Sequence, residues 1–137
     1  MFDLKRTKII KLVNKVWGTE YWLRNDEHYC MKLLGLMPKH RCSMHYHMEK
    51  TETFLLFHGM ILMEIDHEKP KIMNAGELIH IPPLTKHRFT GLVEPNSMIL
   101  ECSTFHEDSD SYRDEDSCKL TEEQWTPIFR MIHNELR

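Results

Sequence analysis

Residues 43–59 read S-M-H-Y-H-M-E-K-T-E-T-F-L-L-F-H-G. His45 and His47 are two residues apart, so they share one face if they lie on a β-strand, where side chains alternate between faces. Glu52 follows five residues after His47, far enough to lie beyond a turn and on the next strand. The apolar run Thr53–Phe57 predicts that strand, and the glycine that ends the stretch predicts the turn that closes it.

A third histidine, His87, lies downstream in I-P-P-L-T-K-H-R-F, residues 81–89. Burying an imidazole without a partner costs on the order of 1–3 kcal/mol, and a buried carboxylate needs a cation or strong donors. A metal ion satisfies both kinds of group, and a mixed nitrogen and oxygen donor set suits divalent transition metals. We therefore predict that His45, His47, Glu52 and His87 hold one divalent metal inside a small barrel. The donor set alone does not select among Mn, Fe, Zn, Ni and Co.

Composition points to a single globular domain, because 137 residues with 41% apolar and 28% charged side chains can bury a core. The formal net charge of -3 predicts no general attraction to nucleic acid or to an anionic membrane. No apolar run reaches the roughly 20 residues needed to span a bilayer, and the N-terminus lacks the features of a signal peptide. A cytoplasmic protein is therefore expected. The four cysteines are widely spaced and favour free thiols over disulfides; they are Cys30, Cys42, Cys102 and Cys118.

After a short leader over residues 1–7, residues 8–104 hold about ten short apolar segments separated by turn residues, which is typical of an all-β sandwich or barrel. Residues 105–120 are acidic and poor in apolar side chains, and they predict a surface loop. Residues 121–137 predict a terminal helical segment. The whole chain, 1–137, therefore reads as one domain.

The terminal segment begins with Thr121-Glu-Glu-Gln124, which has the form of a helix capping box. Pro127 either kinks this helix or starts a new one. An apolar stripe is expected to pack against the barrel; its members are Trp125, Ile128, Phe129 and Ile132.

Two charged residues interrupt apolar strands, Lys32 in Y-C-M-K-L-L and Glu101 in M-I-L-E-C-S. Either they point inward and supply acid–base groups, or they lie on the outer face or against a dimer partner. If Glu101 points inward, Ile99 and Ser103 point inward with it. Arg88, beside His87, either binds an anionic group such as a phosphate or forms a surface salt bridge.

The remaining histidines are weaker candidates for metal ligands. Five fall in predicted turns, loops or the terminal helix: His40, His58, His67, His106 and His133. His80 lies within a predicted strand and points either outward or toward the ligands from a second layer.

The two histidine segments resemble the two sequence motifs of the cupins. The first motif is Gly, five residues, His-x-His, three or four residues, Glu, six residues and Gly; the second is Gly, five residues, Pro-x-Gly, two residues, His, three residues and Asn. The matching residues are His45, His47, Glu52 and Gly59, then Gly76, Pro82 and His87. Three positions depart from the motifs: Lys39, Leu84 and Gly91. The resemblance implies a cupin double-stranded β-helix, or jelly-roll barrel, with a short C-terminal helix and one metal.

A looser resemblance narrows the function. Trp17-Gly18, Ser43, His87-Arg88, Ile99-Leu100-Glu101 and the acidic stretch Glu107–Asp110 are similar to the cupin domain of mannose-6-phosphate isomerases. That similarity implies a metal-dependent isomerase that acts on a sugar or sugar phosphate through an enediol. Such a reaction needs a metal to polarise a carbonyl and a base to move a proton between adjacent carbons. Glu101 and Lys32 are the candidate catalytic residues, and Arg88 is the candidate for binding substrate.

Two other functions fit the same motifs. One is an Fe(II)-dependent cupin dioxygenase, because four protein ligands leave two positions of an octahedral ion open. The other is a non-catalytic cupin that binds a small molecule, with the metal bracing the strands. Cupins often pair, so a homodimer is expected, and an apolar N-terminal strand could form its interface through Ile9, Ile10, Leu12 and Val13.

Overall fold

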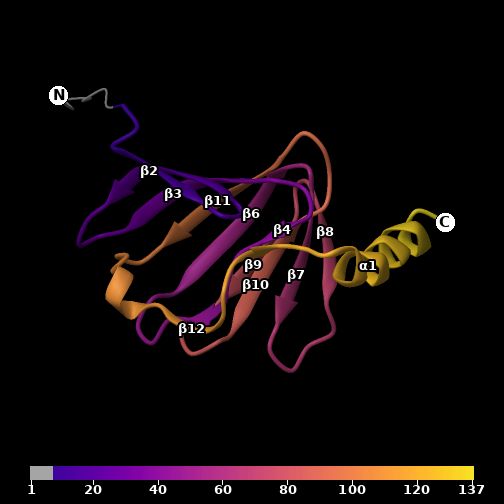
Figure 1. The fold of residues 1–137 in the computed structure, drawn as a ribbon. Coiled ribbons are helices and arrows are strands. Elements are labelled where there is room, and N and C mark those ends of the chain that lie inside the picture. Colours follow the sequence, from indigo (N-terminus) through magenta and orange to yellow (C-terminus); the bar gives the residue numbers. More distant parts are fainter. Residues whose placement is uncertain (1–7) are drawn as a thin grey trace.

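A computed structural model describes residues 8–137 of the chain, so the predicted leader, residues 1–7, lies outside the described residues. The protein is an all-β sandwich of two antiparallel sheets with one helix at its C-terminal end (Figure 1). This architecture confirms the predicted jelly-roll class. No helix in residues 8–137 is long and apolar enough to cross a membrane.

One sheet contains six strands: β1 (Lys11–Lys15), β2 (Gly18–Asn25), β3 (Cys30–Leu36), β6 (Glu52–His58), β9 (Leu78–Ile81) and β11 (Ser97–Ser103). Their order is β1-β2-β3-β11-β6-β9, so β11 joins the early hairpins to the strand that carries Glu52. The other sheet contains β4 (His40–Arg41), β5 (Met44–Tyr46), β7 (Met60–Ile65), β8 (Lys71–Asn74), β10 (His87–Gly91), β12 (Tyr112–Glu115) and β13 (Cys118–Lys119). Its strand order is β12-β5-β10-β4-β13, with β7 paired to β10 and β8 paired to β7.

Strand register brings the predicted site residues together. His87 on β10 pairs with His45 on β5, and Glu101 on β11 pairs with Lys32 on β3. Alternation along β11 buries Ile99, Glu101 and Ser103 on one face, as expected if Glu101 points inward. Lys32 and Glu101 are only 2% and 4% exposed, so both point into the sandwich rather than to its outer surface.

The acidic segment 105–120 differs from the expected surface loop. It contains a short 3-10 helix, η1 (Asp108–Asp110), followed by β12 and β13, which extend the second sheet at β5 and β4. Every residue of β12 is exposed, so its composition carries no apolar alternation that would identify a strand. Backbone pairing with β5, which composition does not reveal, forms this edge.

The C-terminal helix, α1 (Glu122–Glu135), begins with the predicted capping box. Thr121 accepts a hydrogen bond from the backbone N–H of Gln124, and the Gln124 side chain accepts one from the backbone N–H of Thr121. Pro127 lies inside the helix, which continues through it.

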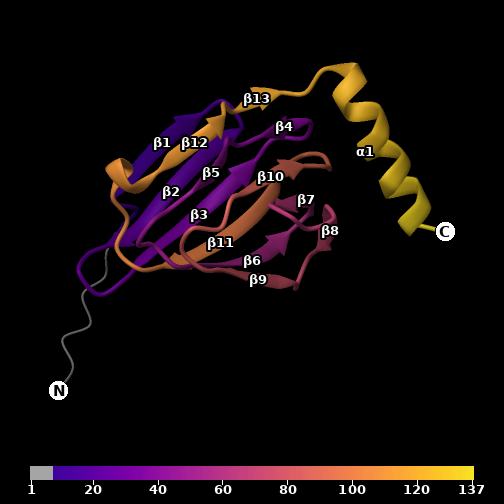
Figure 2. The ribbon, with the colours of Figure 1, turned by 90° about the horizontal axis from the view of Figure 1, so that it is seen from below.

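The helix lies beside β7 and β8, at the end of the sandwich remote from β1 and β2 (Figure 2). It packs on a small cluster of Leu62, Ile72 and Leu92 through Trp125, Ile128, Met131 and Ile132. Phe129 was expected in this stripe but is 48% exposed and stacks edge-on against His133. All four cysteines are free, which confirms the prediction of thiols.

Two of the three departures from the cupin motifs fall at special backbone positions. Lys39 and Leu84 stand where the motifs have glycine, and their φ angles are +58° and +63°. These values lie in the left-handed region that favours glycine, so the fold keeps the glycine geometry with a side chain present. Gly91 replaces the usual asparagine, and a Cβ there would lie 2.3 Å from the Met37 carbonyl oxygen. The close approach requires glycine at that position.

Replacing Leu84 by glycine should therefore stabilise the protein. Leu84 is 65% exposed, so little packing is lost, while left-handed strain of about 1–2 kcal/mol is relieved against a smaller entropic cost. We expect Leu84→Gly to raise the free energy of unfolding by about 0.5–1 kcal/mol, measured by urea denaturation. Leu84→Ala, which removes the side chain but keeps the strain, is the matched control. Equal stability of the two variants would contradict the account of backbone strain.

Candidate metal centre

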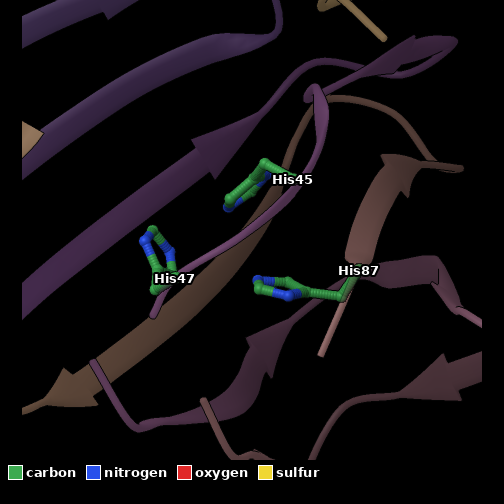
Figure 3. A group of neighbouring side chains, drawn as sticks. All are labelled: His45, His47 and His87. Atoms are coloured by element: carbon green, nitrogen blue, oxygen red, sulfur yellow. The ribbon is translucent and has the colours of Figure 1, made fainter. Parts of the chain in front are cut away.

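Three histidine side chains converge between the two sheets. One ring nitrogen from each of His45, His47 and His87 lies within 4.8 Å of the others, so the group could hold a metal ion. His45 and His47 come from the same segment, at and just after β5, and His87 begins β10 on the other side (Figure 3). The ring centroids are 4.5–6.0 Å apart. The period-two spacing and the β5–β10 pairing together produce this convergence.

A backbone carbonyl fixes the orientation of each ring. The Nδ1 atoms of His45 and His87 lie 2.8 and 2.9 Å from the carbonyl oxygens of the residues two positions earlier, Ser43 and Thr85. Nδ1 of His47 lies 2.7 Å from the carbonyl oxygen of Asp110. A carbonyl only accepts, so each Nδ1 carries the hydrogen and each Nε2 keeps its lone pair. Backbone contacts of this kind are typical of histidines that bind metals through the other nitrogen.

Glu52 completes a cluster of electron donors. Its carboxylate is buried, with Oε2 3.1 Å from Nε2 of His87 and Oε1 3.5 Å from Nε2 of His47. Among the described residues, both of these Nε2 atoms and Glu52 Oε2 are buried without a hydrogen-bond donor. Atoms that all carry lone pairs repel one another at such distances unless a cation lies among them. Protonating several rings would place like charges within 6.0 Å, so a divalent metal fits this donor set better.

Electrostatics keep the same groups in the protonation states that metal binding needs. Burial, with the neighbouring His87, lowers the pKa of His45 to about 3, so its ring is neutral at pH 7. Burial alone would raise the pKa of Glu52, but the ammonium of Lys50, 2.7 Å away, favours the ionised carboxylate and the pKa lies well below its usual value. The carboxylate is therefore ionised and the imidazole is not.

A buried ion network adjoins the histidines. Lys50 Nζ lies 2.7 Å from Glu52 Oε1 and 2.8 Å from Glu101 Oε1. Lys32 Nζ lies 3.9 Å from Glu101 Oε2 and 3.7 Å from Glu20 Oε2. The same ammonium lies 3.9 Å from the centroid of the Trp22 ring, a cation–π contact. The structure thus brings Lys32 and Glu101 to the histidine cluster through Lys50.

The pKa values of Glu101 and Lys50 are both raised, for different physical reasons. Burial raises the pKa of Glu101, although Lys50 partly opposes the rise. Burial lowers the pKa of Lys50, but the carboxylates of Glu101 and Glu52 outweigh it and raise that pKa above its ordinary value. Lys50 therefore stays charged, while Glu101 is the carboxylate most easily protonated.

Lys50 and Glu20 are two site residues that were not predicted from the sequence. Lys50 lies two residues before Glu52, and this period-two spacing, the same that links the two histidines, is the signal that could have revealed it. Glu20 lies among half-buried positions of β2, and its sequence context has no comparable signal. His106 was placed among the weak candidates, yet its Nδ1 lies 3.1 Å from Lys50 Nζ.

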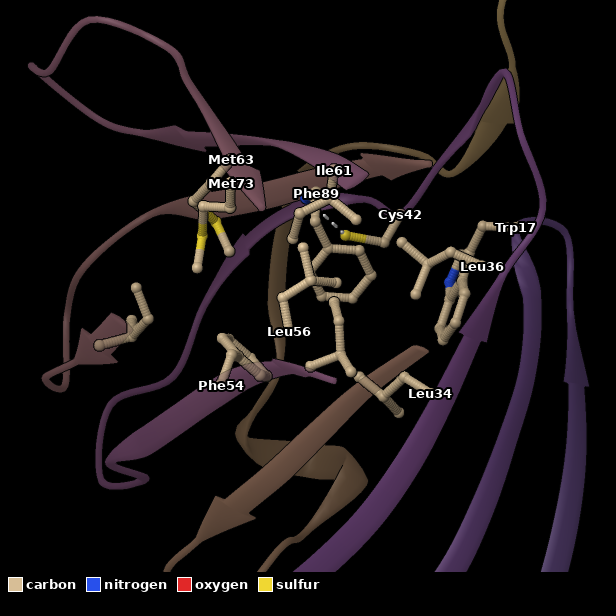
Figure 4. Packing of buried hydrophobic residues seen from close by; sticks show 12 residues of the cluster. Trp17, Leu34, Leu36, Cys42, Phe54, Leu56, Ile61, Met63, Met73 and Phe89 are labelled. Atoms are coloured by element: carbon tan, nitrogen blue, oxygen red, sulfur yellow. Dashed lines mark hydrogen bonds between the residues drawn. The ribbon is translucent and has the colours of Figure 1, made fainter. Parts of the chain in front are cut away.

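The cluster opens into a cavity of about 530 Å3, within the range of small-molecule sites. Its apolar wall belongs to the main core, shown in Figure 4, and includes Trp17, Leu34, Cys42, Phe54 and Phe89. Aromatic edge-to-face contacts fix this wall, with Phe89 5.6 Å from Trp17 and 5.8 Å from Phe54 between ring centroids. The cavity is therefore apolar on one side and charged on the other.

Arg88 does not line this cavity. Its guanidinium forms a two-point contact with Glu64, at 2.7 and 2.9 Å, and a further contact of 2.6 Å with Glu115. The arginine that does line the cavity is Arg113 on β12, which pairs in register with His45. Arg113 could not be predicted as a cavity residue, because it lies in the segment expected to be a surface loop.

Comparison with known proteins agrees with this architecture. No protein of curated function matches the sequence. Among solved structures, the capsular polysaccharide assembling protein CapF from Staphylococcus aureus superposes with a TM-score of 0.67 at 16% identity, covering 82% of this chain and 33% of CapF. Streptomyces Pac13, solved with uridine, superposes with a TM-score of 0.67 at 14% identity, covering 82% of this chain and 93% of Pac13. A protein from Planctomyces limnophilus superposes with a TM-score of 0.65 at 16% identity, covering 80% of this chain and 96% of that protein.

These likenesses establish the fold, and the chain spans only a third of CapF. A family model provides the assignment. The model described as mannose-6-phosphate isomerase C-terminal matches residues 3–122, which is most of the chain. The two motifs, the jelly-roll sandwich and the converging histidines agree with it. The chain therefore belongs to the mannose-6-phosphate isomerase C-terminal family, within the cupins.

Proposed function

We propose that the protein is a metal-dependent isomerase of a sugar or sugar phosphate, in which His45, His47, Glu52 and His87 hold one divalent metal. The observation that carries the proposal is the buried Lys50–Glu101 pair, which lies directly beside the histidine cluster inside a cavity of suitable size. A non-catalytic barrel has no need of buried acid–base groups there, and their burial costs stability.

The position of each side chain in the cavity suggests its role in the proposed reaction. A divalent metal at this site would polarise a substrate carbonyl and the hydroxyl beside it. Glu101 takes the proton from the carbon that bears the hydroxyl and returns it to the neighbouring carbon, through an enediol, while the hydroxyl proton passes to the former carbonyl oxygen. Lys50 and Lys32 face the two oxygens of Glu101 and stabilise its charged form between these transfers. The apolar wall of Phe54 and Phe89 excludes water from the reacting carbons.

Relatives with the same fold support proton-transfer chemistry on sugar-containing molecules. Pac13 is described as a nucleoside dehydratase, and CapF as a capsular polysaccharide assembling protein. Removal of water and isomerisation both begin by moving a proton, and neither consumes oxygen. These descriptions, with that of the matched family, favour an isomerase over an Fe(II) dioxygenase.

The charges around the cavity support an anionic substrate. Equal numbers of basic and acidic side chains line it: Lys15, Lys32, Lys50 and Arg113 against Glu20, Glu52, Glu101 and Asp108. A bound divalent cation would leave positive charge in excess, which favours a phosphate or carboxylate. Among residues 8–137, Arg113 has no acidic partner within 4.0 Å, whereas Arg88 has two. Arg113 is thus better placed than Arg88 to receive an anionic group.

Metal analysis tests the site itself. Protein purified without a histidine tag should contain about one equivalent of divalent metal, measured by mass spectrometry of the ashed sample. His87→Ala should lower metal affinity by at least about 100-fold, because it removes a ligand that a backbone carbonyl orients. In wild type, excess metal should raise Tm by roughly 5–15 °C.

His80→Ala is the control, since that exposed ring lies near Thr53 on the other side of β6. Equal affinities of the two variants would refute the site. Manganese or zinc in the purified protein supports the isomerase, whereas iron supports the dioxygenase.

Solvent exchange tests the reaction. An aldose, ketose or sugar phosphate incubated with metal-loaded protein in deuterated water should gain deuterium beside its carbonyl, detected by NMR. Glu101→Gln should slow this exchange by about 100- to 10,000-fold, the usual contribution of a general base. The variant should keep its metal, because Glu101 is not a proposed ligand. Absence of exchange across these substrates would exclude the isomerase, and oxygen uptake with a diol would favour the dioxygenase.

We also propose that two copies of the chain pair through the outer face of the six-stranded sheet. Strand register aligns one apolar side chain from every strand into a row: Leu12, Tyr21, Leu33, Leu100, Leu55 and Leu78. An outward sheet face normally carries polar side chains. The row contains no charge, so it does not repel a second copy of itself across a twofold axis. Five strand spacings make it about 24 Å long, which matches the width of a typical dimer interface.

Leu78→Lys should convert the dimer to a monomer. Leu78 is exposed at one end of the row, so the change leaves the core intact and places a charge in the interface. Light scattering after size-exclusion chromatography measures the molar mass. Phe129→Lys, an equivalent change on the exposed side of α1, should leave the dimer unchanged. A wild-type monomer would refute this interface.

A further inference from the structure

The turn between β5 and β6 carries two residues of the site. His47 lies at its start, and Lys50, which contacts Glu52 and Glu101, lies near its end. Turns of this kind are held by hydrogen bonds to their exposed backbone amides, and without them the chain samples other conformations. The position of His47 and Lys50 therefore depends on what satisfies the amides of residues 48–50.

A single side chain from the acidic segment satisfies all three amides. The Asp110 carboxylate accepts from the backbone N–H of Met48 at 2.8 Å, and from those of Glu49 and Lys50 at 3.2 Å each. The backbone carbonyl of the same residue accepts the Nδ1–H of His47 at 2.7 Å. Asp110 thus fixes the turn with its side chain and the imidazole with its main chain.

Other acidic residues of this segment have different contacts. Asp108 lies 2.9 Å from Nε2 of His106, and Asp114 pairs with Lys86. Glu115 contacts Arg88. Of these acids, Asp110 is the one whose carboxylate binds the backbone of the turn that carries His47.

We propose that Asp110 is a positioning residue of the metal centre: it holds the turn of residues 48–50 and the His47 ring in the orientation that metal binding requires. This inference rests on the proposed metal site. Other backbone contacts lie at the two ends of the turn. The N–H of Leu84 donates to the His47 carbonyl at 2.7 Å, and Thr104 both donates to the Thr51 carbonyl at 3.1 Å and accepts from the Thr51 N–H at 3.2 Å through its hydroxyl. Loss of the Asp110 carboxylate leaves three amides without an acceptor and lets His47 move away from the other two histidines.

Metal affinity, rather than activity, tests the inference. Zn2+ binding to metal-free protein is measured by competition with a chromophoric chelator, well below the Tm of every variant. Asp110→Ala should weaken binding by about 10- to 100-fold, as loss of an outer contact to a ligand typically does. The Zn2+ affinity of Asp110→Asn should lie between those of Asp110→Ala and wild type. The amide oxygen of asparagine can accept from the Met48 N–H, whereas its NH2 group cannot accept from the other two amides.

Asp114→Ala is the matched control, since it removes an exposed carboxylate from the same segment and should leave Zn2+ affinity unchanged. The visible spectrum of the Co2+ complex provides a second readout: Asp110→Ala should change the ligand-field bands, whereas a loss of general stability alone would not. If Asp110→Ala does not fold, Asp110→Asn and its Co2+ spectrum carry the test.

The outcomes separate the two proposals. Wild-type protein that binds neither Zn2+ nor Co2+ would refute the proposed metal site. If wild-type protein binds these metals and the Asp110 variants have the same affinity and spectrum, the proposed role of Asp110 is refuted. The proposed metal site is then unaffected.

Discussion

The interior of the sandwich places three imidazole lone pairs and one ionised carboxylate against one another, and this cluster of electron donors needs a cation. Each imidazole hydrogen is committed to a backbone carbonyl, so the ring nitrogens that face inward cannot donate to Glu52. The neighbouring charges extend the same requirement outward. Glu52 and Glu101 share the ammonium of Lys50, and Lys32 lies between Glu101 and Glu20. The charge balance of the core therefore depends on whether the histidines bind a cation.

Two different features of the fold, sheet register and a contact from the acidic segment, place the residues of the site. Period-two alternation and strand register bring His45, His87 and the Glu101–Lys32 pair together, and these depend only on the two sheets. The placement of His47 and Lys50 depends instead on Asp110, from a segment that joins the sandwich as an edge. The proposed metal centre, built from both segments, therefore requires the acidic segment to be folded against β5.

Much of the fold could be predicted from the sequence, because short apolar segments between turn residues are a strong signal for an all-β chain. The strands Met60–Ile65, Leu78–Ile81 and Ser97–Ser103 have the bounds that their apolar runs suggest. Edge strands were harder to predict. Residues Tyr112–Glu115 are all exposed, so they carry no apolar alternation that would predict their pairing to β5. The exposure of Phe129 could likewise not be predicted, because it depends on which face of α1 packs against β7 and β8.

The histidines and Glu52 were accessible from sequence, since their spacing relates directly to strand geometry. Arg88 and Arg113 were not distinguishable in this way, because the partners that occupy Arg88, Glu64 and Glu115, are distant in sequence. The role of Asp110 could not be predicted for a related reason: its carboxylate binds backbone amides 60 to 62 residues away, and such contacts do not depend on the residue types that provide the amides.

Anomalous diffraction tests the central claim most directly. Crystals of the metal-loaded protein, measured above and below the absorption edge of the bound metal, should show one strong peak in each protomer. We predict that this peak lies about 2.0–2.2 Å from Nε2 of His45, His47 and His87 and from an oxygen of Glu52. A peak elsewhere, or hydrogen-bonded water in place of the peak in crystals grown with excess metal, would contradict the account.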